Sequence, residues 1–508
     1  MLKPLKIFYQ KDVFTMLKIL RQPLFAETQF ASSKELLNDL ELSEFLGRFF
    51  ESPLRYITCD KEAIVERNEI CKALLRNEGL VEVLRKFYDI SLVFQDKRVA
   101  ADGEPIQIIR SMIGVRLFWD TTISVIHTIA NCKNLPDVFL VLANDLTMML
   151  NKLYPANFDE AWDKYAFGVQ LPASISFRMH FSENLMVESI ALASVSSQKF
   201  TKKNLLSRFG NAEALRTLSL TNLFPTKYSD PDFVEVLSNS VHQIYSTQSN
   251  ASKNQMKVLE RRIASELKDI SNELCFILGM VECARALNAC SQHTCFAEIL
   301  DKSDCTLCAE NIVHPVLSEK IDVVANSVVI DNTRQLILLG GVNMGGKTTY
   351  LRTIGAMQLL FQLGLPIPAS QASISLVTGI YSVFAREEDA MLSEGKLGRE
   401  LSEMRDAVSA LNENTLFLGN EPISATSPEE SYYLSRESLC MLKAKCVRGI
   451  WVTHLFELFD DASKLNELPF GSQFQFMHTS SIDGEQKYIV RSGLPEKYSG
   501  AKDVFMSV

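Results

Sequence analysis

No stretch of this 508-residue sequence is apolar for long enough to cross a lipid bilayer, which takes about 20 residues of helix. The first ten residues also lack the apolar core and the small-residue cleavage site of a secretory signal. Together these two absences predict a cytoplasmic protein with no membrane partner. Hydrophobic residues at 47% and charged residues at 22% exclude a disordered chain, and the length favours several folded domains.

The chain also lacks an excess of positive charge. It has 52 lysines and arginines against 61 aspartates and glutamates, which gives a formal net charge of −9. The overall charge therefore gives no reason to expect nucleic-acid binding, and a DNA surface would need a local basic patch. One such patch is Lys199, Lys202, Lys203, Arg208 and Arg216, with little acid between them. It is either a solvated face or a set of phosphate contacts, and Lys199, Lys202, Lys203 and Arg208 are our DNA-binding candidates.

A second C-x-x-C pair is missing beside Cys305 and Cys308, which have zinc-like spacing. Cys290, His293 and Cys295 lie in the same stretch. The pattern leaves two interpretations open, a metal site or buried thiols that act as small hydrophobic side chains. In a cytosolic chain the eleven cysteines are expected to remain thiols.

The most informative stretch is Gly-Val-Asn-Met-Gly-Gly-Lys-Thr-Thr at 341–349, which follows the phosphate-loop pattern G-x-x-x-x-G-K-[ST]. Glycines let backbone N–H groups surround a phosphate, Lys347 would reach the β- and γ-phosphates, and the Thr348 hydroxyl would hold Mg²⁺. We predict a buried strand at 335–339 and a helix at 348–363 whose N-terminus faces the phosphates. The candidate nucleotide-binding residues are Gly341, Asn343, Met344, Gly345, Gly346, Lys347, Thr348 and Thr349.

Helical patterns dominate the first half of the chain. We predict helices at 34–49, capped by Ser33, and from Asp60 to Arg76. Residues 105–154 are helical and apolar with a break near 134–136, and alternation over 170–195 predicts a β-hairpin.

Residues 232–290 lack proline and hold a single glycine, which predicts a long helix. Its apolar residues recur every three or four positions as a seam that needs a partner, expected within 106–154. A coiled coil and a plain bundle helix both fit this pattern. The seam consists of Met256, Leu259, Ile263, Leu267, Ile270, Leu274 and Ile277.

The loop with its continuation, Gly-Val-Asn-Met-Gly-Gly-Lys-Thr-Thr-Tyr-Leu-Arg at 341–352, closely resembles the nucleotide loop of the MutS family of DNA mismatch-repair ATPases. His314-Pro315 stands where that family has a His-Pro pair ahead of its ATPase domain, and 60–79 resembles the start of its core domain. The resemblance implies ATP and Mg²⁺ as ligands, DNA as a partner and a homodimer.

The resemblance also implies an α+β multidomain fold. A helical core with long lever helices and a short β insertion would precede a phosphate-loop (P-loop, ABC-type) α/β ATPase domain. The expected domains are a core segment at 1–104, levers at 105–309 with a clamp-like insertion at 170–231, and the ATPase domain at 310–508.

Two further stretches resemble ATPase motifs of the family. The strand 416–420 leads into Asn420-Glu421, where the family has Asp-Glu; Glu421 is the candidate general base, and Asn420 is a Mg²⁺ ligand with oxygen but no charge. A strand from 448 ends at Thr453-His454, and His454 stands at the family's γ-phosphate-sensing histidine. Gly398 replaces the serine of a signature that reaches the partner subunit's nucleotide, although Glu403 and Met404 align with it.

We find no Phe-x-Glu wedge near the start, and expect neither the mismatch-reading and connector domains nor a nuclease extension. Two functions therefore remain. One is an ATP-hydrolysing DNA clamp for mismatched, branched or distorted DNA. The alternative is an ATP-gated assembly module with weak hydrolysis that binds a protein or ribonucleoprotein.

Overall fold

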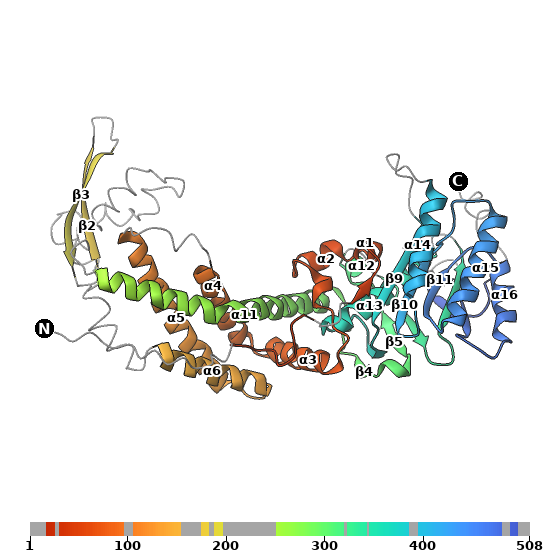
Figure 1. The fold of residues 1–508 in the computed structure, drawn as a ribbon, viewed down its shortest axis with the longest axis horizontal. Helices are drawn as coiled ribbons and strands as arrows, with labels where there is room; N and C mark the ends of the chain where they lie inside the picture. Colours follow the sequence, from red (N-terminus) through yellow and green to blue (C-terminus); the bar gives the residue numbers. More distant parts are fainter. Residues whose placement is uncertain are drawn as a thin grey trace. The chain divides into compact units, whose positions relative to one another are not determined.

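The chain divides into two compact units, each assembled from separate stretches of sequence (Figure 1). The first comprises residues 1–19, 82–133 and 139–272, and the second comprises 20–81, 134–138 and 273–508. The computed structural model describes residues 17–25, 30–95, 105–153, 174–181, 187–196, 250–319, 323–342, 345–385, 395–479 and 488–495.

The first unit is built around helices that the sequence largely predicted. The expected helical region 105–154 is confirmed as α5 (Pro105–Asn131) and α6 (Asp137–Leu153), with the break where it was predicted. Helix α4 (Glu78–Gln95) packs on α5, since the rings of Phe94 and Phe118 meet at 5.8 Å.

The long helix α11 (Asn250–Cys290) confirms the predicted helix over the described part of 232–290. On one side, Gln95 of α4 donates to the Ser271 hydroxyl of α11 at 2.6 Å. On another, Lys152 of α6 lies near Glu266 of α11: burial raises the pKa of Glu266, and the charge of Lys152 offsets part of that rise. Helix α11 thus has neighbours in both α4 and α6; α6 lies within the region expected to supply the partner, and α4 is a partner that the sequence did not indicate. The buried seam residues are Leu259, Ile263, Leu267, Ile270, Leu274 and Ile277.

The predicted hairpin is confirmed as β2 (Ser174–Phe181) and β3 (Val187–Ser196), which pair antiparallel with Ile175 opposite Val195. The four DNA-binding candidates and Arg216 lie outside the described residues.

Two local features of the N-terminal stretch test its predicted helices. Helix α3 (Lys61–Arg76) begins as expected, with the Asp60 carboxylate accepting from the Glu62 N–H at 2.9 Å. The single helix predicted at 34–49 is wrong. Two short helices, α1 (Leu36–Asp39) and α2 (Ser43–Gly47), replace it because Glu41 adopts a left-handed backbone at φ 54°, which interrupts the hydrogen-bond ladder.

The second unit contains a seven-stranded sheet in the order β1-β9-β10-β11-β7-β12-β13, parallel except for β13. The strands predicted at 335–339, 416–420 and from 448 are confirmed. The pattern at 473–477 and 487–490 also predicts a closing β-ribbon, and β12 pairs antiparallel with β13 there. The sequence missed that β12 also pairs in parallel with β7. The bounds are β1 (Ala31–Ser32), β7 (Leu336–Gly341), β9 (Gly379–Phe384), β10 (Thr415–Asn420), β11 (Arg448–Val452), β12 (Phe474–Thr479) and β13 (Val490–Ser492).

Helices cover both faces of this sheet. Side chains such as Leu338, Phe417 and Trp451 form a buried core with α14 (Lys396–Ala410), α15 (Pro428–Ala444) and α16 (Glu457–Asn466), which lie together in Figure 1. The opposite face carries α13 (Lys347–Leu363), which confirms the predicted helix.

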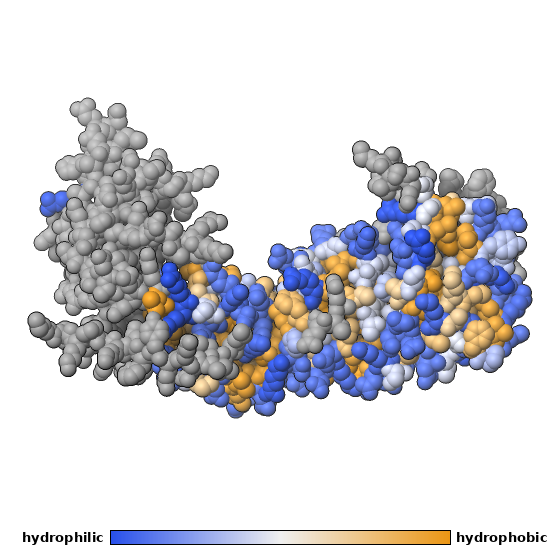
Figure 2. All heavy atoms as spheres, viewed as in Figure 1, coloured by the Kyte–Doolittle hydropathy of each residue, from blue (hydrophilic) through white to orange (hydrophobic). Residues whose placement is uncertain are grey.

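Figure 2 shows hydrophilic residues over much of the coloured surface. Among the described helices, none combines the length and the apolar composition that a membrane span needs.

A smaller sheet in the order β4-β8-β5-β6 adjoins α13. Buried glutamines of α13 make the connection: Gln358 donates to the Ser375 carbonyl at 3.1 Å, and Gln362 donates to the carbonyls of Thr58 and Val377, both at 2.9 Å. Residues near 58 are thereby held on the helix that follows the glycine loop. The strands are β4 (Glu298–Leu300), β5 (Leu307–Ile312), β6 (Asn326–Ile330) and β8 (Gln371–Ser375).

Gly355 of α13 packs directly against two leucine side chains. A Cβ there would lie 2.5 Å from a methyl carbon of Leu40 and 2.6 Å from one of Leu418, both fully buried. We expect Gly355→Ala to lower the free energy of unfolding by about 1–3 kcal/mol through overpacking. Denaturant unfolding would measure it.

The matched control is Gly398→Ala on α14, where a Cβ meets nothing within 4 Å. That change should instead stabilise by about 0.5–1 kcal/mol, since alanine loses less backbone entropy in a helix. Equal effects of the two substitutions would contradict the packing argument.

Candidate functional site

The glycine loop connects the end of β7 at Gly341 to the start of α13 at Lys347. Gly341 and Gly346 have φ of 118° and 88°, in the region that favours glycine. A Cβ on Gly341 would also lie 2.4 Å from the Thr479 hydroxyl oxygen. Both positions thus favour glycine for backbone geometry, and Gly341 also requires it for space. Asn343 and Met344 lie outside the described residues.

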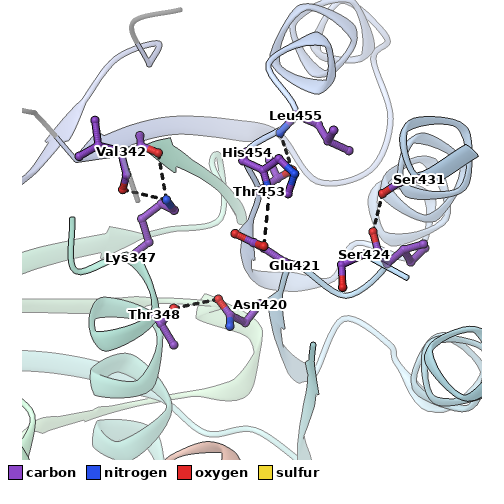
Figure 3. A network of polar contacts seen from close by, with 12 residues as sticks. Val342, Lys347, Thr348, Asn420, Glu421, Ser424, Ser431, Thr453, His454 and Leu455 are labelled. Atoms are coloured by element: carbon purple, nitrogen blue, oxygen red, sulfur yellow. Dashed lines mark hydrogen bonds and ion pairs between the residues drawn. The ribbon is translucent and has the colours of Figure 1, made fainter. Parts of the chain in front are cut away.

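Lys347 points back along its own loop (Figure 3). Its ammonium group donates to the carbonyls of Gly341 at 2.9 Å and Val342 at 3.0 Å. Burial lowers the pKa of Lys347, and the carboxylate of Glu421 offsets part of that effect. The lysine is therefore a cation held inside the loop.

Polar side chains gather at the carboxyl ends of the adjacent strands. The Thr348 hydroxyl donates to the side-chain oxygen of Asn420 at 3.1 Å, which joins the start of α13 to the end of β10. Glu421 follows directly with a left-handed backbone at φ 49°, and its N–H donates to the Val452 carbonyl of β11 at 3.1 Å. A non-glycine residue at positive φ stores strain, which is common at functional sites.

His454 pairs with Glu421, its Nδ1 lying 3.4 Å from a carboxylate oxygen. The hydrogen bond to His454 holds the pKa of Glu421 below its usual range, and the same contact raises the pKa of His454. An ionised carboxylate and a protonated imidazole therefore coexist over a widened pH window, bounded by the lowered pKa of Glu421 and the raised pKa of His454.

A cavity of about 550 Å³ opens beside the loop. Loop and helix residues form one part of its lining, and aliphatic side chains form another, so it offers both polar and apolar surface. It is lined by Ile312, Val313, Leu317, Val323, Val324, Asn326, Gly345, Gly346, Lys347, Thr348, Thr349, Tyr350, Thr353, Glu421 and Tyr488.

Among the cavity residues that were not candidates from the sequence, Asn326 and Tyr488 are joined by a hydrogen bond. The Asn326 side chain accepts from the Val490 N–H at 2.7 Å and donates to the Tyr488 carbonyl at 3.1 Å, which holds Tyr488 beside Gly346. The only signal was that Tyr488 falls in the predicted ribbon, and nothing in the sequence marked Asn326.

Other candidates lie elsewhere in the unit. His314 is fully buried and bonded to the Leu40 carbonyl at 3.0 Å, and burial lowers its pKa, so its described contacts are structural. Gly398 lies on α14, where Arg399 pairs with Glu403 at 3.1 Å. Within the described ranges no three His, Cys, Asp or Glu residues come together as a metal site, and Cys290, Cys295, Cys305 and Cys308 form no disulfide.

A largely parallel sheet in which an inner strand passes through a glycine loop into a helix, with polar residues at the carboxyl ends of nearby strands, is the arrangement of phosphate-loop α/β domains. Residues 337–501 match the family described as MutS domain V. This match, together with curated relatives, supports a member of the MutS family.

Curated relatives agree with this assignment. A protein named Endonuclease MutS2 from Lactococcus lactis subsp. lactis (strain IL1403) is 29% identical over 239 residues. One of the same name from Streptococcus agalactiae serotype Ia is 30% identical over 238 residues. Each alignment covers 46% of this chain and 30% of the relative, so it spans less than a third of the relatives' length.

Proposed function

We propose that this chain is an ATPase that binds ATP with Mg²⁺ beside the glycine loop and couples the nucleotide to DNA binding in a homodimer. The observation that carries the proposal is the convergence of Lys347, Asn420 and the Glu421–His454 pair at the carboxyl ends of three neighbouring strands. The match of this region to MutS domain V supports it.

The residues present fit an ATP–Mg²⁺ ligand. The loop offers backbone N–H groups at a helix N-terminus and a buried lysine, which suits phosphates, while the aliphatic part of the cavity suits a base. The oxygens of Thr348 and Asn420, which already meet at 3.1 Å, would hold Mg²⁺. Bound Mg²⁺ would neutralise charge on the phosphates.

The proposed catalytic roles belong to Glu421 and His454. Glu421 would accept a proton from the attacking water as general base, because its lowered pKa keeps it ionised. His454 orients that carboxylate through their contact and, when protonated, places a positive charge near the phosphate end of the site.

Asn420 is the least favourable element for hydrolysis, because an amide oxygen lacks the charge of the carboxylate found in the family. Asn420→Asp should lower the Mg²⁺ concentration for half-maximal turnover by about tenfold, as one added charge–metal contact of ~1.4 kcal/mol would do. A Mg²⁺ titration of ATPase rate measures it. The isosteric change Asn414→Asp in the turn before β10 is the control. An unchanged midpoint would remove Asn420 from the metal site.

DNA contact is proposed for Lys199, Lys202, Lys203 and Arg208, with structure rather than sequence recognised. Replacing all four with Gln should weaken DNA binding and flatten its salt dependence by about 0.9 in log–log slope for each phosphate that the variant no longer neutralises. Fluorescence anisotropy across a salt series would show this, with ATP binding as the control. If the variant kept the parental DNA affinity and salt dependence, the DNA surface would have to consist of other residues.

One experiment separates the two candidate functions. ATP turnover is measured alone and with duplex, mismatched and branched DNA. Stimulation by branched or distorted DNA supports the clamp. ATP binding with negligible turnover and no DNA binding would favour the assembly module, a function favoured by Asn420 and by Gly398 in place of a serine.

A further inference from the structure

The loop that carries Glu421 runs from the end of β10 to the start of α15 and is anchored at both ends. At its start the Glu421 N–H is bound by the Val452 carbonyl. Two residues later the Ile423 carbonyl accepts from the Ser431 hydroxyl of α15, and at the end of the loop Ser427 caps α15. Between these anchors lie Ser424 and Ala425, whose N–H groups take no part in the sheet's hydrogen-bond ladder.

A single carboxylate holds this middle part. Glu400, in the first turns of α14, is 5% exposed. One of its oxygens accepts from the N–H groups of Ser424 and Ala425, both at 2.9 Å, and the other accepts from the Ser424 hydroxyl at 2.9 Å. Burying a carboxylate is costly unless it is fully bonded, and three hydrogen bonds to one ion are the strong, geometrically specific kind.

The position of this contact matters because the Glu421 backbone is strained. Its φ of 49° is sparsely populated for glutamate, so the conformation persists only where the surroundings enforce it. Glu400 binds the N–H of Ser424, which follows Glu421 by three residues. This is the first backbone N–H after the turn that a side chain from another element holds. Releasing it would let the turn relax and the Glu421 carboxylate move.

We propose that Glu400 is a positioning residue of this site, which fixes the loop after β10 so that Glu421 faces His454 and Lys347 and which ties that geometry to the start of α14. The inference rests on the proposed ATPase function. It adds a coupling: a displacement of the first turns of α14 is transmitted by the carboxylate to the general base. Glu400 itself does not line the cavity and contacts no reacting atom.

The test variant is Glu400→Gln, which keeps the shape but replaces one acceptor oxygen by a donor that faces N–H or O–H groups. The first readout is the NMR titration of the His454 imidazole, assigned with His454→Gln. In the parent the contact with Glu421 raises the pKa of His454, and Lys347 is the other charged group that faces the pair. In Glu400→Gln we expect the pKa of His454 to fall toward its ordinary value.

The second readout is kinetic. Glu400→Gln should lower kcat by about tenfold or more, as small misplacements of catalytic groups do, while the Kd for ATP changes less than about twofold. A role in stability alone would leave the kcat of the folded variant and the pKa of His454 at parental values.

Two further variants keep the test decisive. Asp406→Asn on the same helix neutralises an exposed carboxylate and should leave both readouts at parental values. Ser424→Ala removes only the hydroxyl contact and should give the same changes at smaller size, about two- to threefold in kcat. If Glu400→Gln does not fold, Ser424→Ala decides alone.

The outcomes separate the two proposals. If the unsubstituted protein shows no ATP turnover, the proposed function is contradicted. The His454 titration then still tests the positioning role of Glu400. A parental pKa for His454 in Glu400→Gln, or a parental pKa in Ser424→Ala where the first variant is unfolded, overturns the positioning role. A folded Glu400→Gln variant with the parental kcat overturns it as well.

Discussion

Replacing Lys347 with Ala should weaken ATP binding by about 100-fold, the equivalent of ~3 kcal/mol for hydrogen bonds to charged phosphate groups. The lysine is 6% exposed and already bound to two loop carbonyls, so its ammonium group is preorganised at the helix N-terminus. Burial lowers its pKa, yet Glu421 favours the charged form. Isothermal titration calorimetry with ATP and Mg²⁺ measures the effect.

The control for Lys347→Ala is Lys464→Ala, which removes an exposed lysine that pairs with Asp461 on the surface of α16. It should bind ATP like the parent. Circular dichroism would establish that Lys347→Ala is folded, since the buried side chain also ties the loop to itself. A folded Lys347→Ala variant with parental ATP affinity would show that the glycine loop is not the nucleotide site.

Glu421→Gln should bind ATP with near-parental affinity and hydrolyse it about 10²–10⁴ times more slowly, the range expected for loss of a general base. Glutamine keeps the shape of the side chain but accepts no proton at neutral pH. The contact with His454 would also weaken from an ion pair to a neutral hydrogen bond. Single-turnover hydrolysis with saturating ATP isolates this step from nucleotide release.

A matched glutamate supports the interpretation. Glu437 is exposed on α15 beside Arg436, and Glu437→Gln should hydrolyse ATP at the parental rate. If Glu421→Gln turned over as fast as the parent, the base would have to be a different residue. If it lost ATP binding instead, Glu421 would act in binding and not in proton transfer.

The local elements of the second unit were predictable because they depend on short stretches of sequence. Apolar runs give β7, β10 and β11, and the glycine loop between a strand and a helix needs no distant partner. The Asp60 cap placed the start of α3 for the same reason. The helix prediction at 34–49 failed because its pattern did not reveal the left-handed turn at Glu41.

The sequence allowed us to predict which residues of the site lie near one another, but not the contacts between them. Parallel strands end at one edge of a sheet, so the residues that follow β7, β10 and β11 had to be neighbours once those strands were adjacent. Their hydrogen bonds were not predictable, because the pairing of Thr348 with Asn420 joins residues 72 positions apart. The roles assigned to these residues, the DNA surface and the three-domain division stay predictions.

The sequence by itself determined the strand–loop–helix at 335–363, the helical first half and the resemblance to the MutS family, since each rests on local spacing and residue type. Only the tertiary structure decided that Ala31–Ser32 pairs with β9 at the sheet edge, that Asn326 holds Tyr488 in the cavity, and that Glu400 binds the loop after β10. The physical reason is that hydrogen bonds across long sequence separations leave no periodic trace in the chain. They exist because folding brings together a donor and an acceptor that are far apart in the chain.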